Sequence, residues 1–364
     1  MSAARETVDA RLSWPRLTRR RLLALSVASV LTRSTHTCAS PSIDSRPLVT
    51  PETDAAIEHG LEWLAGRQQA DRAFGPLTAF NRYRLNPAVN GLCGLALLSS
   101  GSTPGRGPYG AHLDQCVDLL ADSARPTGFI SERDAEYDQS PMYGHGFATM
   151  FLAEAYGMAR RRDLRGVVHR AVQLIIDTQN REGGWRYAPE PRDADISVTV
   201  CQMMALRAAH NTGIAVPREV IDRAIGYVTR CQNPDGGFRY QSLTGGESAF
   251  PRSAAALAAL FTSGVADGPV VESGLRYLHQ FRPGEPTAID RGYYFYAQYY
   301  AVQVAWHAGL EAWSAWYPAM RDELLRQQLS DGHWVDPVIS PEYATAMALI
   351  ALQLPNNYLP IFQR

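Results

Sequence analysis

Two kinds of helical pattern alternate along the chain from about residue 51 onward. The first mixes charged and apolar residues at helical spacing, as in residues 223–228. Because an α-helix repeats about every 3.6 residues, its apolar positions form one stripe, and such a helix buries one side only. The second kind is small and apolar almost all round, as in residues 254–260 and 344–354, which is typical of a helix buried on every side. The pattern therefore predicts partly exposed outer helices that alternate with buried inner helices.

A short turn motif follows several of the outer helices. It consists of Gln, three residues, Gly, one residue and an aromatic residue, and it occurs at Gln179–Trp185, Gln232–Phe238 and Gln328–Trp334. Glycine supplies the positive φ that lets a helix end and the chain reverse. The inner helices carry a second motif, in which Thr, Ser or Asn is followed after five residues by Ala-Leu; it begins at Asn90, Thr199, Ser253 and Thr345. Together the two motifs predict six helix pairs between about Thr53 and Leu354.

Alternating outer and inner helices form two concentric layers, and six pairs can close into a ring. Closure removes the exposed terminal repeats that an open solenoid must cap. We therefore predict an all-α fold, a single (α/α)6 toroid over residues 51–364.

The first fifty residues have the character of an export signal and a linker. Thr18 and three arginines precede an apolar stretch that ends at Leu31, which is too short to span a bilayer comfortably. The paired arginines resemble a twin-arginine signal, with an ordinary secretory signal or a lipoprotein signal at Cys38 as alternatives. We expect a signal over residues 1–39, a linker over residues 40–50, and a periplasmic or extracytoplasmic protein, with membrane association left open. No later segment is long and apolar enough for a transmembrane span.

Charge and cysteine content narrow the choice of partners. Net charge is −1, but residues 1–50 carry eight Arg and three acids (+5), and the remainder carries 27 Arg and 33 acids (−6). An acidic main body argues against a nucleic-acid partner. The sequence has no CxxC, HExxH, P-loop or dinucleotide-binding motif, so we expect no metal and no cofactor. Cys93 and Cys201 lie in apolar helical patterns and are predicted to be buried.

The Gln-x3-Gly-x-Trp/Phe repeats resemble the QW-type motifs of the squalene/terpenoid cyclase and protein prenyltransferase superfamily. The resemblance covers about residues 51–364, and residues 357–362 are similar to the carboxyl end of squalene–hopene cyclases. It implies the toroid fold and an apolar, isoprenoid-like ligand, but many activities share one fold. Residues 250–260 lack the Asp, Cys and His that hold zinc in protein prenyltransferases, which argues against that activity.

The run Asp193-Ala194-Asp195-Ile196 resembles the DxDD motif of class II terpenoid cyclases, whose middle Asp protonates an alkene or epoxide. The resemblance makes Asp195 the candidate general acid, with Asp193 and His145 in support. Ile196 stands where the family has a further Asp, and this weakens an arrangement that must keep a strong acid protonated. The alternative is that the acids cap a helix and that His145 hydrogen-bonds a helix end.

The amino ends of the inner helices should gather at one mouth of the ring. Polar and aromatic residues at these ends are candidates for a ligand pocket: Tyr143, Asp290, Arg291, Tyr293, Tyr296, Glu342 and Tyr343. Aromatic rings there would line an apolar pocket or stabilise a cation. Core packing is the alternative for the tyrosines, and helix capping for the acids.

Two functions follow from these features. The first is a binding module without turnover, which takes an apolar isoprenoid-like ligand or a protein partner at the mouth of the toroid. The second is a squalene/terpenoid cyclase-like isomerase with Asp195 as general acid. Ile196 and the absence of room for a second helical domain favour the first; the acid pair and the tyrosines favour the second.

Overall fold

The structure is a computed structural model that describes residues 48–76, 83–132, 140–283 and 293–363. The expected export signal lies outside these ranges, as does nearly all of the expected linker. Within them the chain forms twelve α-helices and two short 3₁₀ helices, and extended residues pair only as isolated bridges. The all-α fold class is confirmed.

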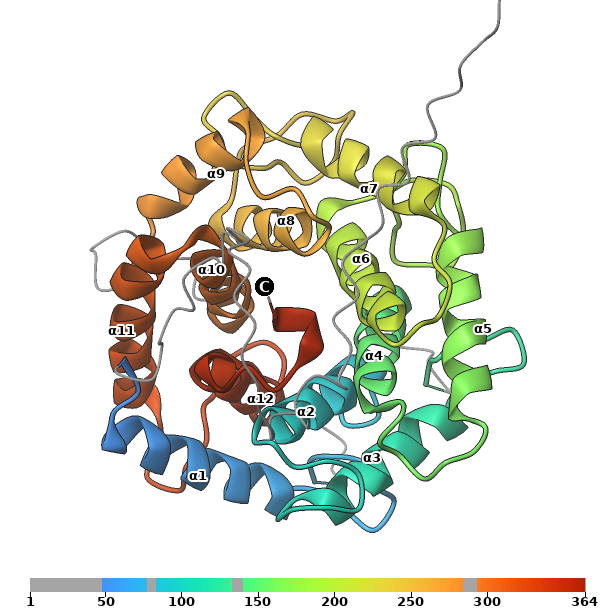
Figure 1. Ribbon diagram of the computed structural model, residues 1–364, viewed down its shortest axis with the longest axis vertical. Coiled ribbons are helices and arrows are strands. Elements are labelled where there is room, and N and C mark those ends of the chain that lie inside the picture. Colours follow the sequence, from blue (N-terminus) through green and yellow to red (C-terminus); the bar gives the residue numbers. More distant parts are fainter. Residues whose placement is uncertain (1–47, 77–82, 133–139, 284–292, 364) are drawn as a thin grey trace, which may run out of the picture. The chain divides into compact units, whose positions relative to one another are not determined.

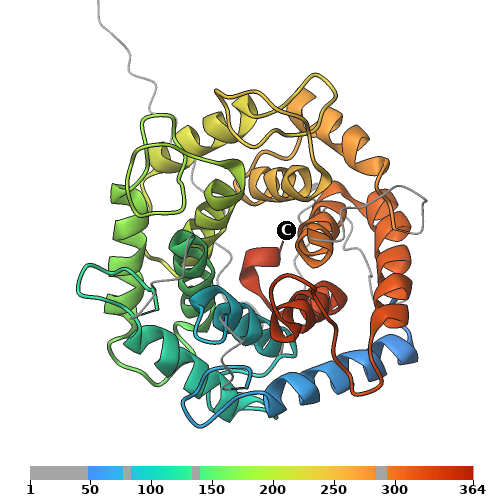
Figure 2. The same cartoon turned by 180° about the vertical axis from the view of Figure 1, so that it is seen from behind.

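Outer and inner helices alternate along the chain as predicted. The outer helices are α1 (Pro51–Gly66), α3 (Gly110–Asp122), α5 (Leu164–Asp177), α7 (Arg218–Arg230), α9 (Pro269–His279) and α11 (Leu310–Gln327). The inner helices are α2 (Pro87–Ser99), α4 (Pro141–Ala155), α6 (Ile196–Asn211), α8 (Phe250–Thr262), α10 (Tyr294–Ala308) and α12 (Pro341–Gln353). Figures 1 and 2 show an inner ring of helices surrounded by an outer ring.

The ring is closed. Each inner helix packs against the next, from α2 through α4, α6, α8 and α10 to α12, and α12 packs against α2 again. Outer helix α1 also packs against α11 and α12, so the first helix pair meets the last. The predicted (α/α)6 toroid is confirmed for the described part of the chain.

Burial follows the predicted difference in composition between the layers. Outer helix α7 buries one stripe and exposes its charged side; the buried residues are Val220, Ile221, Ala224, Tyr227 and Val228. In inner helix α8 every residue from Ser253 to Thr262 is buried. Small residues let inner helices approach closely: a Cβ added to Gly91 on α2 would lie 2.9 Å from the Phe147 carbonyl oxygen on α4. None of the described helices has the length and apolarity that crossing a membrane requires.

The cysteines of the described part belong to the core. Cys93, Cys116, Cys201 and Cys231 are all buried free thiols, which confirms the prediction for Cys93 and Cys201. Burial raises the pKa of Cys231 to about 11, so its thiol is protonated at neutral pH.

The Gln of the turn motif joins two neighbouring outer helices. Gln179 donates from Nε2 to the Gly183 carbonyl in its own turn at 2.8 Å and to the Val220 carbonyl on α7 at 2.9 Å. Three other glutamines bridge their own turn and the next outer helix in the same way: Gln68 to Arg72 and His112, Gln232 to Gly236 and Val270, and Gln328 to Gly332 and Ala56. Since a buried carbonyl without a donor is costly, each Gln stabilises the turn and the contact between helices together.

The aromatic residue of the motif ties the turn to the inner helix. Trp185 donates its backbone N–H to Oγ1 of Thr199 on α6 at 3.1 Å and its indole N–H to the Ile175 carbonyl on α5 at 2.7 Å. In four other turns an inner-helix side chain accepts the equivalent backbone N–H: Phe74 to Asn90, Ile130 to His145, Phe238 to Ser253, and Trp334 to Thr345. This explains the recurrent Thr, Ser or Asn on the inner helices. We call the contacts made by the Gln, Gly and aromatic residues the turn clamp.

The Gly of the turn clamp lies directly against the next outer helix. Gly183 has φ +96°, and a Cβ added there would lie 2.2 Å from the Arg223 carbonyl oxygen on α7. Gly128, Gly236 and Gly332 share the positive φ and meet the carbonyls of Arg170, Ser273 and His59 in the same way. Glycine is therefore required both by the backbone conformation and by the close approach.

The seam between the last helix pair and the first has additional contacts. Gln328, at the end of α11, donates to the Ala56 carbonyl on α1 at 2.9 Å. The Arg67 guanidinium, just after α1, donates to the buried Glu342 carboxylate on α12 at 2.8 and 2.9 Å. The ring of His333 stacks on Trp63 at a centroid distance of 4.5 Å. These contacts join the first helix pair to the last, which are separated by almost the whole length of the toroid sequence.

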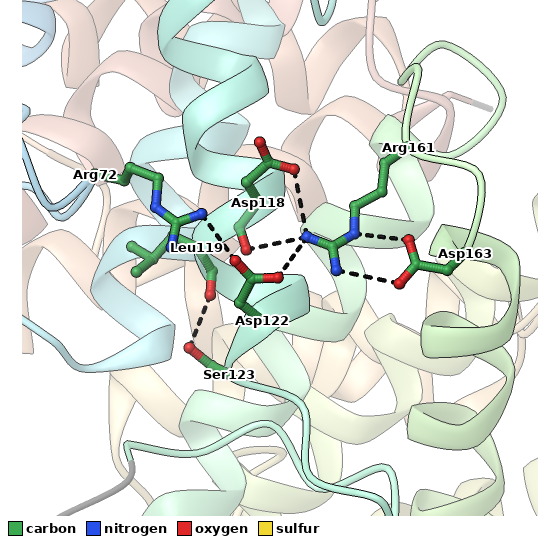
Figure 3. Close-up of polar contacts among 7 residues, drawn as sticks. All are labelled: Arg72, Asp118, Leu119, Asp122, Ser123, Arg161 and Asp163. Carbon is green, nitrogen blue, oxygen red and sulfur yellow. Dashed lines mark hydrogen bonds and ion pairs between the residues drawn. The ribbon is translucent and has the colours of Figure 1, made fainter.

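An arginine network joins three helix pairs at the outer surface (Figure 3). Arg161, in the loop before α5, pairs with Asp118 and Asp122 on α3 at 3.3 and 2.7 Å and with Asp163 at 2.8 Å. Arg72, after α1, pairs with the other oxygen of Asp122 at 2.9 Å. Exposed ion pairs contribute little each, so the network helps to align neighbouring pairs rather than to hold the ring together.

The two demands on the clamp glycine can be separated by comparing Gly183→Ala with Gly157→Ala. Gly157 also has positive φ (+88°), but no atom lies within 4 Å of a Cβ added there. We expect Gly157→Ala to lower the free energy of unfolding by about 1 kcal/mol through backbone strain alone. Gly183→Ala adds a clash with backbone and should cost at least about 3 kcal/mol. Urea denaturation measures both, and equal losses would contradict the close approach.

Candidate functional site

Asp195 caps the amino end of inner helix α6. Its Oδ1 accepts the backbone N–H groups of Ser197 and Val198, each at 2.9 Å, and its own N–H donates to the Trp185 carbonyl at 3.0 Å. The residue is fully buried. The other carboxyl oxygen, Oδ2, is buried too, and Nε of Arg186 lies 3.7 Å from it. The Tyr240 hydroxyl is a further neighbour of the carboxyl group. One oxygen is thus anchored by the helix end, and the other faces the Arg186 side chain.

Burial raises the pKa of Asp195 to about 6, because removal from water disfavours the charged form. The N–H groups of Val198 and Ser197 and the nearby Arg186 guanidinium act in the opposite direction. Nε of Arg186 lies 3.7 Å from Oδ2, which is beyond hydrogen-bond distance. The carboxyl group therefore keeps its proton in mildly acidic solution and is mostly ionised at neutral pH.

Arg186 and two tyrosines form a cluster beside Asp195, which we call the Arg–Tyr cluster. The Arg186 guanidinium carbon lies 4.7 Å from the ring centre of Tyr187 and 5.4 Å from that of Tyr240. The two tyrosine hydroxyls hydrogen-bond to each other. The backbone carbonyl of Tyr187 accepts the Met142 N–H at the start of α4, and that of Tyr240 accepts the Ile196 N–H at the start of α6. The cluster is therefore fixed to the amino ends of two inner helices.

Tyrosines from the first turns of α4 and α10 lie near the same carboxyl group. Tyr143 and Tyr296 are half-buried, yet burial is the main cause that raises the pKa of both, and the Asp195 carboxylate raises it further. Half-buried Ser197 lies close to both hydroxyls, and buried Tyr343 on α12 lies near Tyr296. Tyr143, Ser197 and Tyr296 keep some accessible surface, whereas Tyr343 is buried. We call these four residues the tyrosine recess.

The recess and the Arg–Tyr cluster are continuous. The rings of Tyr143 and Tyr187 lie 6.3 Å apart. The Tyr296 hydroxyl is buried, with the hydroxyls of Ser197 and Tyr300 close to it. The site therefore combines a buried acid with aromatic side chains at the mouth where inner helices begin. Nowhere in the described ranges do three or more His, Cys, Asp or Glu side chains gather as metal ligands.

His145 has a structural role, and the predicted support of Asp195 is corrected. Its Nδ1 accepts the Ile130 N–H and its Nε2 bonds to the Ala171 carbonyl, both at 3.1 Å. Burial lowers the pKa of His145 to about 4, so the imidazole is neutral. Both ring nitrogens are bonded to backbone groups. His145 accepts a backbone N–H in its turn clamp, as Thr199 does in the next turn clamp.

Two predicted acids have other partners. The Asp193 side chain is 61% exposed and forms an ion pair with Arg186 at 3.3 Å, so it touches the Arg–Tyr cluster from outside. Glu342 is buried at the ring seam, where Arg67 holds it, and it is not part of the tyrosine recess. Neither acid caps a helix, because Asp195 caps α6 and Ser340 caps α12; both acids form ion pairs instead.

The remaining predicted residues precede α10. Tyr293 is 57% exposed, because it lies just before the helix rather than on its inward face. Asp290 and Arg291 lie outside the described residues.

Sequence reasoning missed the Arg–Tyr cluster, although its signal was present. The two turns read Gly-Gly-Trp-Arg-Tyr at 183–187 and Gly-Gly-Phe-Arg-Tyr at 236–240. The turn clamp explains the glycines and the aromatic residue but not the Arg-Tyr that follows. An identical pair beyond the structural motif could have marked Arg186, Tyr187 and Tyr240 as candidates.

Comparisons with known proteins agree on the fold. No family model matches the chain. Drimenyl diphosphate synthase from Streptomyces showdoensis is 30% identical over 128 residues, which is 35% of this chain and only 23% of that protein. A solved structure of the type II terpene cyclase MstE from Scytonema covers 86% of this chain and is itself 99% covered, with a TM-score of 0.58 and 16% identity.

Two other similar structures have different activities. Cellobiose 2-epimerase from Spirochaeta thermophila covers 87% of this chain and is 99% covered, with a TM-score of 0.62 and 14% identity. An α-1,6-mannanase from Salegentibacter sp. covers 83% and is 99% covered, with a TM-score of 0.61 and 12% identity. The chain thus has the α/α toroid fold that terpene cyclases share with the epimerase and the mannanase, and this fold alone selects no chemistry.

The raised pKa of Asp195 predicts that the stability of the fold depends on pH. Asp195→Asn should remove this dependence, because Asn does not ionise, while its side-chain oxygen still caps the helix. The folded pKa, about 6, lies above the reference value of 3.8. Folding therefore favours the protonated form, and the wild type loses stability as the pH rises between these values. Two pKa units correspond to about 3 kcal/mol.

We expect the free energy of unfolding of Asp195→Asn, relative to wild type, to rise by about 2–3 kcal/mol from pH 4 to pH 7. Urea denaturation at several pH values measures it. Asp193→Asn, the same charge change at an exposed position, is the control. A difference for Asp195→Asn that stays constant with pH would show that the carboxyl group is not perturbed.

Proposed function

We propose that this toroid binds an apolar, isoprenoid-like ligand at the tyrosine recess. The observation that carries the proposal is a group of half-buried tyrosines from opposite sides of the inner ring, next to a buried carboxyl group, and we infer that these side chains line a concave site. Sites for apolar ligands are concave and aromatic, with few polar groups. The similar structure of MstE was solved with geranylgeranyl dihydroxybenzoate as substrate, an isoprenoid.

The tyrosines supply most of the binding surface. Tyr143 on α4 and Tyr296 on α10 present large rings to an apolar chain, and burial of apolar area is the main favourable term. The Arg186 guanidinium already contacts Asp193 and two tyrosine rings. We therefore do not assign it to an anionic headgroup of the ligand.

Binding without turnover is supported better than catalysis. At a pKa of about 6, Asp195 is mostly ionised at neutral pH, whereas protonating an isolated alkene needs a strong acid that is kept protonated. Two backbone N–H groups and Arg186 stabilise its carboxylate form. Ile196 is buried where the resembling motif has a further carboxyl group that would oppose ionisation.

Acid-initiated cyclisation is the second candidate, and the raised pKa of the buried Asp195 carboxyl group favours it, because Oδ2 is not bound by the helix end and could hold the proton. In that reaction the O–H bond at Oδ2 breaks and its proton joins a terminal alkene carbon or an epoxide oxygen. An epoxide oxygen is the easier acceptor for an acid of this strength. The resulting cation would lie beside the electron-rich tyrosine faces. The Asp195 carboxylate would be held by Ser197 and Val198, and the final deprotonation of the cyclised cation would restore the proton balance.

Extraction tests the binding proposal. The purified full chain is extracted with organic solvent, and the extract is examined by mass spectrometry for polyprenyl and triterpene species. We expect wild type and Tyr293→Ala to retain an isoprenoid, and Tyr296→Ala to retain at least about tenfold less, because only Tyr296 lines the recess. No isoprenoid in the wild type, or equal retention by all three proteins, would exclude the proposal.

Asp195→Asn separates the two candidates. Wild type and variant are incubated with farnesyl diphosphate, squalene or epoxidised squalene, and products are analysed for cyclic isomers. Binding without turnover predicts no isomer from wild type and unchanged ligand retention by the variant. An isomer formed by wild type and lost in Asp195→Asn, with retention preserved, would establish the cyclase instead.

A further inference from the structure

We propose that the C-terminal segment, residues 354–363, forms the floor of the ligand site and limits the length of the isoprenoid chain that fits. This inference rests on the proposed ligand binding and adds a specificity-determining element to it. The segment comprises η4 (Leu354–Asn356) and η5 (Pro360–Phe362), which follow α12. Both views of the ring place the C-terminal end at its centre (Figures 1 and 2).

The segment enters from the mouth opposite to Asp195. It continues from the carboxyl end of α12, and Asn357 reverses the chain with φ +54°. Tyr358 remains 57% exposed and packs beside Gly101, just beyond the carboxyl end of α2. Leu359, Ile361 and Phe362 are then buried. The chain thus folds over one rim of the ring and turns inward.

Phe362 meets side chains from opposite sides of the inner ring. η5 packs against α6. The Phe362 ring lies 6.1 Å from that of Tyr299 on α10, and Tyr299 lies 6.5 Å from Phe147 on α4. Helices α4 and α10 are three places apart in the ring of six inner helices, so these contacts cross its centre. Three aromatic rings therefore fill the centre at this level.

This aromatic level lies only a short way below the tyrosine recess. Phe147 follows Tyr143 by four residues on α4, and Tyr299 follows Tyr296 by three on α10. At a rise of about 1.5 Å per residue the aromatic level lies about 5 Å deeper along the helices. A ligand that begins at Asp195 therefore reaches a barrier well before the opposite mouth. We infer a preference for short isoprenoid chains.

The floor is held by apolar contacts. Within the described part of the segment, the backbone hydrogen bonds of Asn357, Phe362 and Gln363 all end on the segment itself, as does that of the Gln363 side chain. Its attachment to the ring is apolar, and its buried residues are Leu354, Pro355, Leu359, Ile361 and Phe362. Shortening the segment would therefore open space in the ring without leaving buried polar groups of the inner helices unpaired.

The test compares wild type with Phe362→Ala and with a chain that ends at Leu359. Binding of geraniol, farnesol, geranylgeraniol and squalene is measured by quenching of intrinsic tryptophan and tyrosine fluorescence. Tyr358→Ala, in the same segment but exposed, is the control, and thermal unfolding verifies that each protein is folded. We expect wild type and Tyr358→Ala to prefer the shorter alcohols, and both floor variants to bind geranylgeraniol or squalene about tenfold more tightly.

The outcomes separate this inference from the proposed function. If wild type binds none of the four probes, the ligand-binding proposal fails and the floor fails with it. If wild type binds them but the folded Phe362→Ala protein keeps the same preference for chain length, only the floor is wrong. Should the shortened chain not fold, Phe362→Ala decides alone, since it deletes the central ring and leaves the backbone of the segment intact.

Discussion

The glutamine bridge between neighbouring outer helices is the interaction on which this ring depends. An α/α toroid has no sheet to align its helices, and its inner helices offer little besides small apolar surfaces. Each bridging Gln satisfies one carbonyl in its own turn and one on the next outer helix, and the glycine beside it lets the two backbones meet. Such a contact specifies distance and direction, whereas apolar packing alone specifies neither. The contact recurs at four of the six junctions between outer helices, including the closing one at Gln328, and there it helps to set the angle between pairs.

The same turns place the candidate site. Trp185 belongs to a turn clamp, and its carbonyl accepts the N–H of Asp195, while its own N–H is accepted by Thr199 one turn into α6. The carboxyl group is thus set at the helix end by the contacts that build the ring. Arg186 and Tyr187 follow Trp185 directly, so the Arg–Tyr cluster is an extension of the clamp. A site built this way is rigid on the side of the acid and is free to vary in the loops beyond.

The sequence predicted the fold well because the fold is repetitive. Gln, Gly and aromatic residues recur at fixed spacing, and the composition of the inner helices differs from that of the outer ones along the whole toroid. The candidate site was harder to predict, because its residues occur once and no repeat in the sequence marks them. Asp195 was proposed from a local motif, whereas for His145 the structure favours the alternative of a structural hydrogen bond, because its ring accepts the Ile130 N–H. The aromatic level around Phe362 could not be predicted, because the path of the last residues depends on a single reversal at Asn357.

The most direct test of the clamp is the stability of Gln328→Leu, with the adjacent exposed Gln327→Leu as control. Gln328 joins the last outer helix to the first, whereas the exposed side chain of Gln327 contacts Glu323 on its own helix and Tyr294 on α10 and bridges no two outer helices. If the clamp closes the ring, loss of the Gln328 donor leaves the carbonyl groups of Ala56 and Gly332 without this hydrogen bond. The free energy of unfolding in urea should then fall by about 2–4 kcal/mol, while Gln327→Leu should change it by no more than about 0.5 kcal/mol. Equal stability of the two variants would contradict the account.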